Sequence, residues 1–81
     1  MNYNLVAELC DVSDFLESEN EKDHQMVISE LIVVLGGDDI PDGFMAKVTK
    51  VANYLYNMGE YDYEDIVNES IEYLQSVEMS Y

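Results

Sequence analysis

The chain has 81 residues, which is enough for a single domain over residues 1–81 with a modest core. Hydrophobic residues make up 48% of it, which argues against an acidic disordered tail and predicts folding. Eighteen Asp and Glu face three Lys, for a formal net charge of -15. This balance argues against direct binding to nucleic acid or to a membrane surface, because both require protein cations.

The first predicted helix covers about residues 4–17. Leu5, Leu9, Val12 and Leu16 recur at the spacing of one helix face, so we expect them in the core. Cys10 is the only cysteine, which excludes an internal disulfide, and we expect it to be a half-buried helix residue.

The second predicted helix covers about residues 21–35. Asn20 followed by Asp23 makes a plausible start, and Gly36 with Gly37 makes a left-handed C-terminal cap. The segment is apolar around most of its circumference, which indicates the central helix of the fold. Its Val and Ile content also leaves a β-strand over residues 26–35 as an alternative.

The third and fourth predicted helices complete the chain. Pro41 fits the first turn of the third helix, with Asp39 near its free N–H groups, and Gly59 marks its end. Its predicted core stripe consists of Phe44, Val48, Val51 and Leu55. Asp62 is expected to cap the fourth helix, whose predicted buried face consists of Tyr63, Ile66, Val67, Tyr73, Leu74 and Val77. The prediction is an all-α fold, a compact antiparallel bundle of about four short helices.

No catalytic, cofactor or metal site is predicted. Residues 38–43 resemble a calcium loop, but alignment on Gly43 puts Ile40 and Thr49 where ligands are needed. His24, the only histidine, is expected to be a partly buried structural residue, and a Cys10–His24 nucleophilic pair is disfavoured. We therefore expect no enzyme, no cofactor and no metal.

Two known binding modes of small helical domains also fail on this sequence. Acyl carrier proteins carry a prosthetic group on Ser in Asp-Ser-Leu at a helix start, whereas Glu69-Ser70-Ile71 falls in mid-helix. A helix-turn-helix reader would have only Lys47 and Lys50 on its recognition helix, too few for the phosphate contacts.

The arrangement of the acids is the main functional signal. Asp65, Glu69 and Glu72 follow the outer face of the fourth helix, with Asp62 close by, and they form one anionic ridge. Glu8, Asp11 and Asp14 follow a similar course on the first helix, continued by Glu17, Glu19 and Glu21. Phe15, Tyr61, Tyr63 and Tyr81 lie among the acids and are either interface anchors or packing residues.

The whole chain is similar in composition to small acidic inhibitors encoded by bacteriophages, including anti-restriction and anti-CRISPR proteins. The resemblance implies a DNA mimic that binds the basic groove of a nucleic-acid-binding protein. The expected contact residues are Glu8, Asp11, Asp14, Glu17, Asp62, Asp65, Glu69, Glu72, Phe15 and Tyr61.

The alternative is an acidic adaptor or antitoxin-like module that binds a protein through an apolar surface. Met26 and Val33 are expected on the less buried side of the second helix, and such a module often forms a homodimer. Residues 1–6 lack the features of a signal peptide, and the longest apolar run is too short to cross a bilayer, so we expect a cytoplasmic protein.

Overall fold

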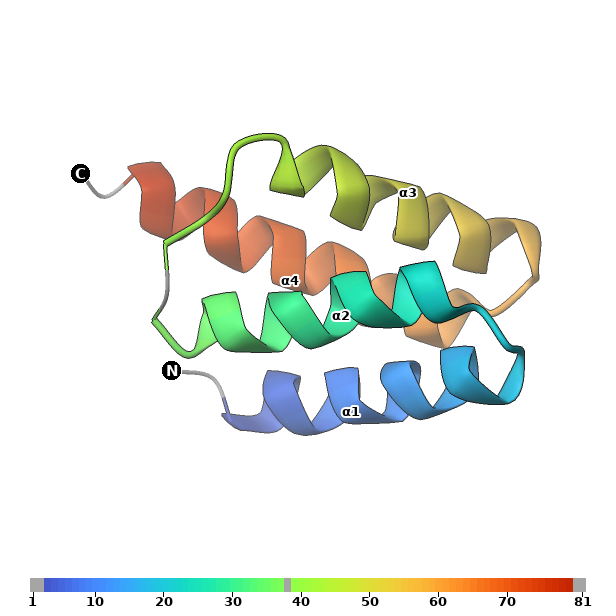
Figure 1. Cartoon of the computed structure of the whole chain (residues 1–81). Coiled ribbons are helices and arrows are strands. Elements are labelled where there is room, and N and C mark those ends of the chain that lie inside the picture. Colours follow the sequence, from blue (N-terminus) through green and yellow to red (C-terminus); the bar gives the residue numbers. More distant parts are fainter. Residues whose placement is uncertain (1–2, 38, 80–81) are drawn as a thin grey trace.

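The computed structural model describes the backbone of residues 3–37 and 39–79 and the side chains of residues 4–37 and 39–76. Four helices make up the described part: α1 (Tyr3–Ser18), α2 (Lys22–Leu35), α3 (Phe44–Asn57) and α4 (Tyr61–Met79). Each helix runs antiparallel to the one before it (Figure 1). The predicted all-α bundle is confirmed, and the alternative strand over residues 26–35 is wrong because this segment is helical.

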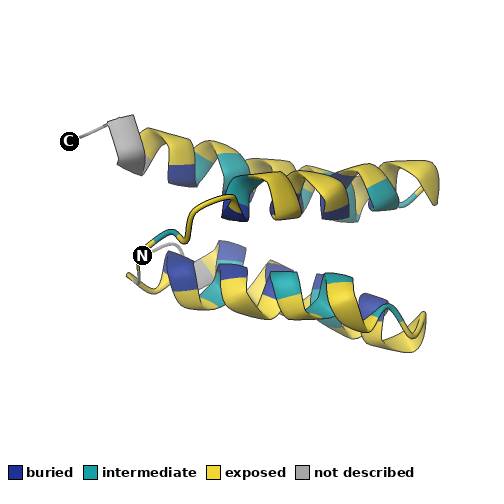
Figure 2. Cartoon of the chain, turned by 45° about the horizontal axis from the view of Figure 1, so that its top comes forward, coloured by how far each residue is buried: buried dark blue, intermediate teal, exposed yellow. Residues whose placement is uncertain are grey.

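The bundle consists of two helical hairpins, α1–α2 and α3–α4. The hairpins lie against each other through contacts of α1 with α4 and of α2 with α3. Figure 2 shows them as two layers, with the buried residues mostly on the helix sides that face other helices. This arrangement makes α1 and α4 neighbours on one side of the molecule and α2 and α3 neighbours on the other.

The core comes from the predicted stripes. The predicted core residues of α1 and α3 are all buried, and on α4 Val67 and Leu74 are buried while Tyr63, Ile66 and Tyr73 are half-buried. Val77, also predicted to be buried, lies outside the described side chains. Burial of one such aliphatic side chain contributes about 1.5–3 kcal/mol, so these stripes are the main source of stability.

The prediction that α2 is the central helix is wrong. Only one side of α2 is buried, through Ile28, Leu31, Val34 and Leu35. In a four-helix arrangement each helix has two neighbours and an outer side, and the other apolar residues of α2 are either half-buried at the edge of the core, as Val27 and Ile32 are, or exposed. Met26 and Val33 are 70% and 53% exposed, as expected for the less buried side of this helix.

The two hairpin turns share one geometry, the Schellman motif. After α1, Glu21 N–H donates to the Leu16 carbonyl at 2.9 Å across Asn20, which has a φ of 60°. After α3, Glu60 N–H donates to the Leu55 carbonyl at 3.0 Å across Gly59, which has a φ of 79°.

These turns correct two predicted helix starts. Asn20 does not start α2 but ends α1, because its left-handed backbone closes the last turn of that helix; the N-cap of α2 is Glu21. Asp62 is not a cap but lies inside the first turn of α4, which begins at Tyr61. The predicted end of α3 at Gly59 is confirmed.

The loop between α2 and α3 connects the two hairpins. Gly37, with a φ of 119°, follows the end of α2 and gives the predicted glycine stop. The predicted start of α3 at Pro41 is wrong: α3 begins at Phe44 with Gly43 as its N-cap, and Phe44 N–H donates to the Pro41 carbonyl at 3.1 Å. Pro41 therefore belongs to a turn before the helix.

Candidate protein-binding surface

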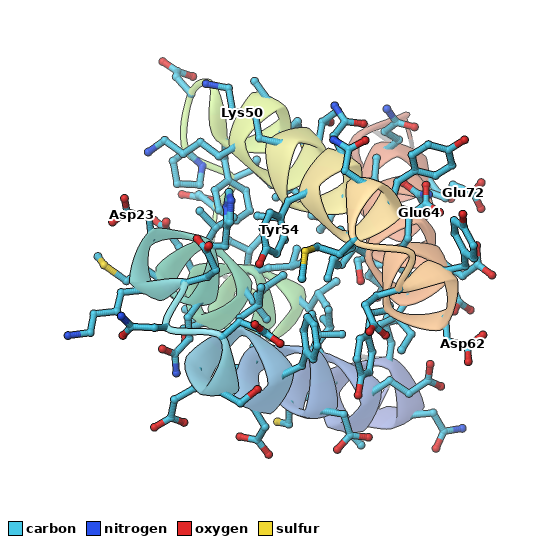
Figure 3. The ribbon with its side chains drawn as sticks, turned by 90° about the vertical axis from the view of Figure 1, so that its right-hand side faces the viewer. Asp23, Lys50, Tyr54, Asp62, Glu64 and Glu72 are labelled. Carbon is cyan, nitrogen blue, oxygen red and sulfur yellow. The ribbon has the colours of Figure 1, made fainter. Side chains whose placement is uncertain are left out.

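The α4 ridge, defined as Asp62, Asp65, Glu69 and Glu72, lies on the outer side of α4. All four side chains are exposed, and successive members are three or four residues apart, close to the helical repeat of about 3.6 residues. Val67, Ser70 and Leu74 face the core on the opposite side of the helix. Figure 3 shows Asp62 and Glu72 projecting away from the other helices. The predicted ridge is therefore one continuous row of carboxylates in solvent.

The acids of α1 are exposed but do not form a matching ridge. Glu8, Asp11, Asp14 and Glu17 recur every three residues, so each lies a little further around the helix than the one before. Glu8 and Asp11 share a side with Phe15, at i, i+3 and i+7, whereas Glu17 lies toward the other side. The similar course predicted for the two rows is wrong in this respect.

An aromatic contact fixes how α1 lies against α4. The rings of Phe15 and Tyr63 are 5.0 Å apart between centroids and both side chains are half-buried. Glu8 and Asp11 lie on the Phe15 side of α1 by helical spacing and are exposed, as is Asp62 on α4. At this point α1 and α4 are therefore joined by an aromatic contact, and these acids remain in solvent. Phe15 packs between α1 and α4, and of the two aromatic contact residues predicted, Tyr61 is the exposed one.

The charge is divided between the two sides of the bundle. Between their bounds, α1 and α4 carry ten Asp and Glu and no Lys, whereas α2 and α3 carry two Asp and Glu and all three Lys. The exposed lysines are Lys22 on α2 and Lys47 and Lys50 on α3. The α1–α4 side is thus strongly anionic and the α2–α3 side is close to neutral.

A second exposed feature was not predicted from the sequence. Tyr56 and Tyr61 are each 57% exposed, and their rings meet edge to face with centroids 5.7 Å apart. Met58, between them at the end of α3, is 45% exposed. Tyr56 directly follows the buried Leu55, which turns it about 100° away from that residue and off the predicted core stripe. This position is the sequence signal that indicates its exposure.

The residues that the sequence analysis considered as nucleophile, metal ligand or prosthetic-group site do not come together in the described structure. Cys10 is exposed rather than half-buried, and the His24 ring packs against Tyr54 with centroids 4.8 Å apart. Ser70 is fully buried, and its hydroxyl donates to the Ile66 carbonyl of its own helix at 3.0 Å. Across the described residues, no three His, Cys, Asp or Glu side chains come together as a metal site. Asp38, part of the calcium-loop comparison, lies outside the described residues.

Comparison with known proteins found no matching family model, no matching curated protein and no matching solved structure. Among the residues that the structure describes, no helix combines the length and the apolar character needed to cross a lipid bilayer.

Proposed function

We propose that this protein is an acidic inhibitor that occupies the basic nucleic-acid-binding groove of a DNA-processing or defence protein and so excludes nucleic acid. The single observation that carries the proposal is the division of charge, with a carboxylate row on α4 and further acids on the adjacent α1. Protein–nucleic acid affinity depends largely on phosphate charge, so a groove built for phosphates also attracts carboxylates held in a row.

The charge density of the α4 ridge supports this assignment. Asp62 and Glu72 are ten residues apart, which is about 15 Å of helix at about 1.5 Å per residue. A nucleic-acid strand carries one phosphate per about 3.4 Å, so about four phosphates cover the same length. The four carboxylates of the ridge therefore present a similar number of negative charges over a similar distance.

The energetic cost of the ridge also supports a binding role. Like charges three or four residues apart on a helix destabilise it by about 0.2–0.5 kcal/mol per pair. Asp62–Asp65, Asp65–Glu69 and Glu69–Glu72 are such pairs, and no lysine on α4 offsets them. The ridge lowers stability and carries more negative charge than solubility requires. A role in binding explains why such a surface is present.

This chain is similar in size and acidity to small inhibitors encoded by bacteriophages. We therefore infer that its target is of the kind that such inhibitors bind, namely a restriction, CRISPR or related DNA-binding protein of the bacterial cytoplasm. In this function the protein acts by occupying a surface and carries out no reaction. It requires no cofactor.

The test is capture of a partner from bacterial lysate with three baits. The wild type is compared with D65N/E69Q/E72Q, which neutralises the ridge, and with E30Q/D39N/D42N, which removes the same charge from exposed acids elsewhere. Asp62 stays unchanged because an acid in the first turn of a helix is stabilising. We expect the wild type and the second variant to retain a nucleic-acid-binding protein that duplex DNA and salt displace, and the ridge variant to lose it. Equal retention by all three baits would refute the proposal.

One observation favours a second candidate, an adaptor that binds a protein through α2. Met26 and Val33 are exposed and lie seven residues apart on one side of this helix. Under this hypothesis M26Q/V33T abolishes capture, and the captured partner resists both salt and DNA because an apolar interface is little screened. Loss of capture in the ridge variant alone would exclude it.

A further inference from the structure

The exposed aromatic pair at the turn between α3 and α4 has an unusual position among the rings of this protein. Among the aromatic side chains that the structure describes, Phe15, Phe44, Tyr54, Tyr63 and Tyr73 are buried or half-buried, whereas Tyr56 and Tyr61 are exposed. Single exposed apolar residues are ordinary, but Tyr56, Met58 and Tyr61 fall within six residues. Together they make one apolar patch at the end of the bundle.

The patch is in line with the α4 ridge. Tyr61, Asp65 and Glu72 occupy positions i, i+4 and i+11 of one helix, which are close to one straight line along its surface. Tyr61 therefore stands at the N-terminal end of the carboxylate row, one turn before Asp65. A partner seated along the ridge extends over the rings.

Exposed aromatic rings beside a row of carboxylates favour a partner that presents arginine side chains. A cation over an aromatic face gains cation–π attraction, and Arg forms such contacts more often than Lys. The planar guanidinium also stacks on a ring while it binds a carboxylate in bidentate fashion, which a Lys ammonium cannot do. An edge-to-face contact occupies at most one face of one ring, so Tyr56 and Tyr61 keep faces open to a partner.

We propose that Tyr56 and Tyr61, with Met58, form the anchor of the interface and bind arginine side chains of the partner. The partner surface is then rich in Arg rather than Lys at the point that meets the α3–α4 turn. This inference rests on the proposed function in one respect, namely that the ridge faces a basic protein surface.

The test measures binding of two fluorescent peptides, nona-arginine and nona-lysine, to the folded protein at one fixed moderate salt concentration. The quantity of interest is the ratio of the two dissociation constants. Y56L/Y61L removes both rings but keeps apolar side chains and the net charge, and Y56F/Y61F keeps the rings without their hydroxyls. Far-ultraviolet circular dichroism confirms that each variant is folded.

We expect the wild type and Y56F/Y61F to prefer nona-arginine, and Y56L/Y61L to lose about five-fold of that preference, the equivalent of about 1 kcal/mol. Binding of nona-lysine should change little among the three proteins. An unchanged ratio in Y56L/Y61L, or a loss of preference in Y56F/Y61F as large as in Y56L/Y61L, overturns the aromatic anchor.

The same assay separates this inference from the proposed function. D65N/E69Q/E72Q should weaken both peptides more than E30Q/D39N/D42N does and should leave the effect of the rings on the ratio in place. If the two charge variants weaken both peptides equally, the ridge is not the preferred cation surface and the proposed function fails. The ratio still reports independently on the rings.

Discussion

The His24 ring on α2 lies 4.8 Å from the Tyr54 ring on α3, centroid to centroid, and this contact joins the two hairpins at one end of the bundle (Figure 3 shows Tyr54 between them). Burial raises the pKa of Tyr54 above its ordinary value of 10.0, and the negative charges of Glu21 and Glu19 raise it further. A hydrogen bond to Glu21 acts in the same direction. The acidic turn after α1 therefore holds the Tyr54 hydroxyl in its neutral form.

This pKa shift predicts a loss of stability in alkali. Because the pKa is higher in the folded than in the unfolded protein, the stabilisation is fully present below the unfolded pKa, about 10, and is lost as the pH rises through the folded pKa. We expect Tyr54→Phe, which keeps the ring against His24, to remove this titrating hydroxyl and to reduce the loss. The measurements are an absorbance titration of tyrosinate and denaturant unfolding on both sides of that pH.

Tyr56→Phe is the matched control, since Tyr56 is an exposed ring two residues away. A Tyr54→Phe protein with the same alkaline titration and the same stability profile as the Tyr56→Phe protein would contradict the assignment. Glu21→Gln should lower the pKa of Tyr54, because it removes both a negative charge and a charged hydrogen-bond acceptor.

The shared geometry of the two hairpin turns predicts an unequal response to substitution at Gly59. A Cβ at this position meets no atom within 4 Å, so the cost of a side chain comes from the left-handed backbone alone. Gly59→Ala should lower the free energy of unfolding by about 1–2 kcal/mol. Gly59→Asn should cost less, because Asn tolerates this conformation and Asn20 adopts it in the equivalent position of the other turn.

Chemical denaturation of the two variants and the wild type decides the point. Equal losses for Ala and Asn would show that the backbone conformation at this turn is not what limits the choice of residue.

The core and the turns differ in how far the sequence predicts them. Apolar spacing identified every buried position of α1 and all those of α3 except Ala52, because the helical repeat and the hydrophobic effect act on the same residues. The helix starts at Asn20, Pro41 and Asp62 were misplaced, because Asn, Pro and Asp each serve several kinds of turn as well as helix starts. Local residue preference does not choose between these uses.

On the candidate surface, too, features within one helix were predictable and contacts between helices were not. The α4 ridge follows from spacing within one helix and was predicted in full. The Phe15–Tyr63 and Tyr56–Tyr61 contacts join residues on different helices, so only the packing of the bundle brings them together. For this reason Phe15 was expected to be an anchor although it packs between helices, and Tyr56 was missed.

The surplus negative charge predicts that neutralising the ridge stabilises the free protein. D65N/E69Q/E72Q removes three like-charge pairs on α4, so we expect a gain of about 0.6–1.5 kcal/mol at low salt, with a rise in melting temperature of a few degrees. These side chains are exposed and none is part of the core, so no packing is lost. Thermal unfolding followed by circular dichroism gives the comparison.

Salt supplies the control for this prediction, because screening acts on the same repulsion without changing the sequence. Raising the ionic strength from about 0.01 M to about 0.15 M shortens the Debye length from about 30 Å to about 8 Å, so repulsion between exposed acids further apart than about 8 Å is largely screened. The wild type should therefore melt at a higher temperature as salt is added, and the gain should be smaller in D65N/E69Q/E72Q. A wild-type melting temperature that falls over this range would mean that the acids take part in stabilising interactions within the fold. In that case the ridge would be structural, and its cost would no longer support a binding role.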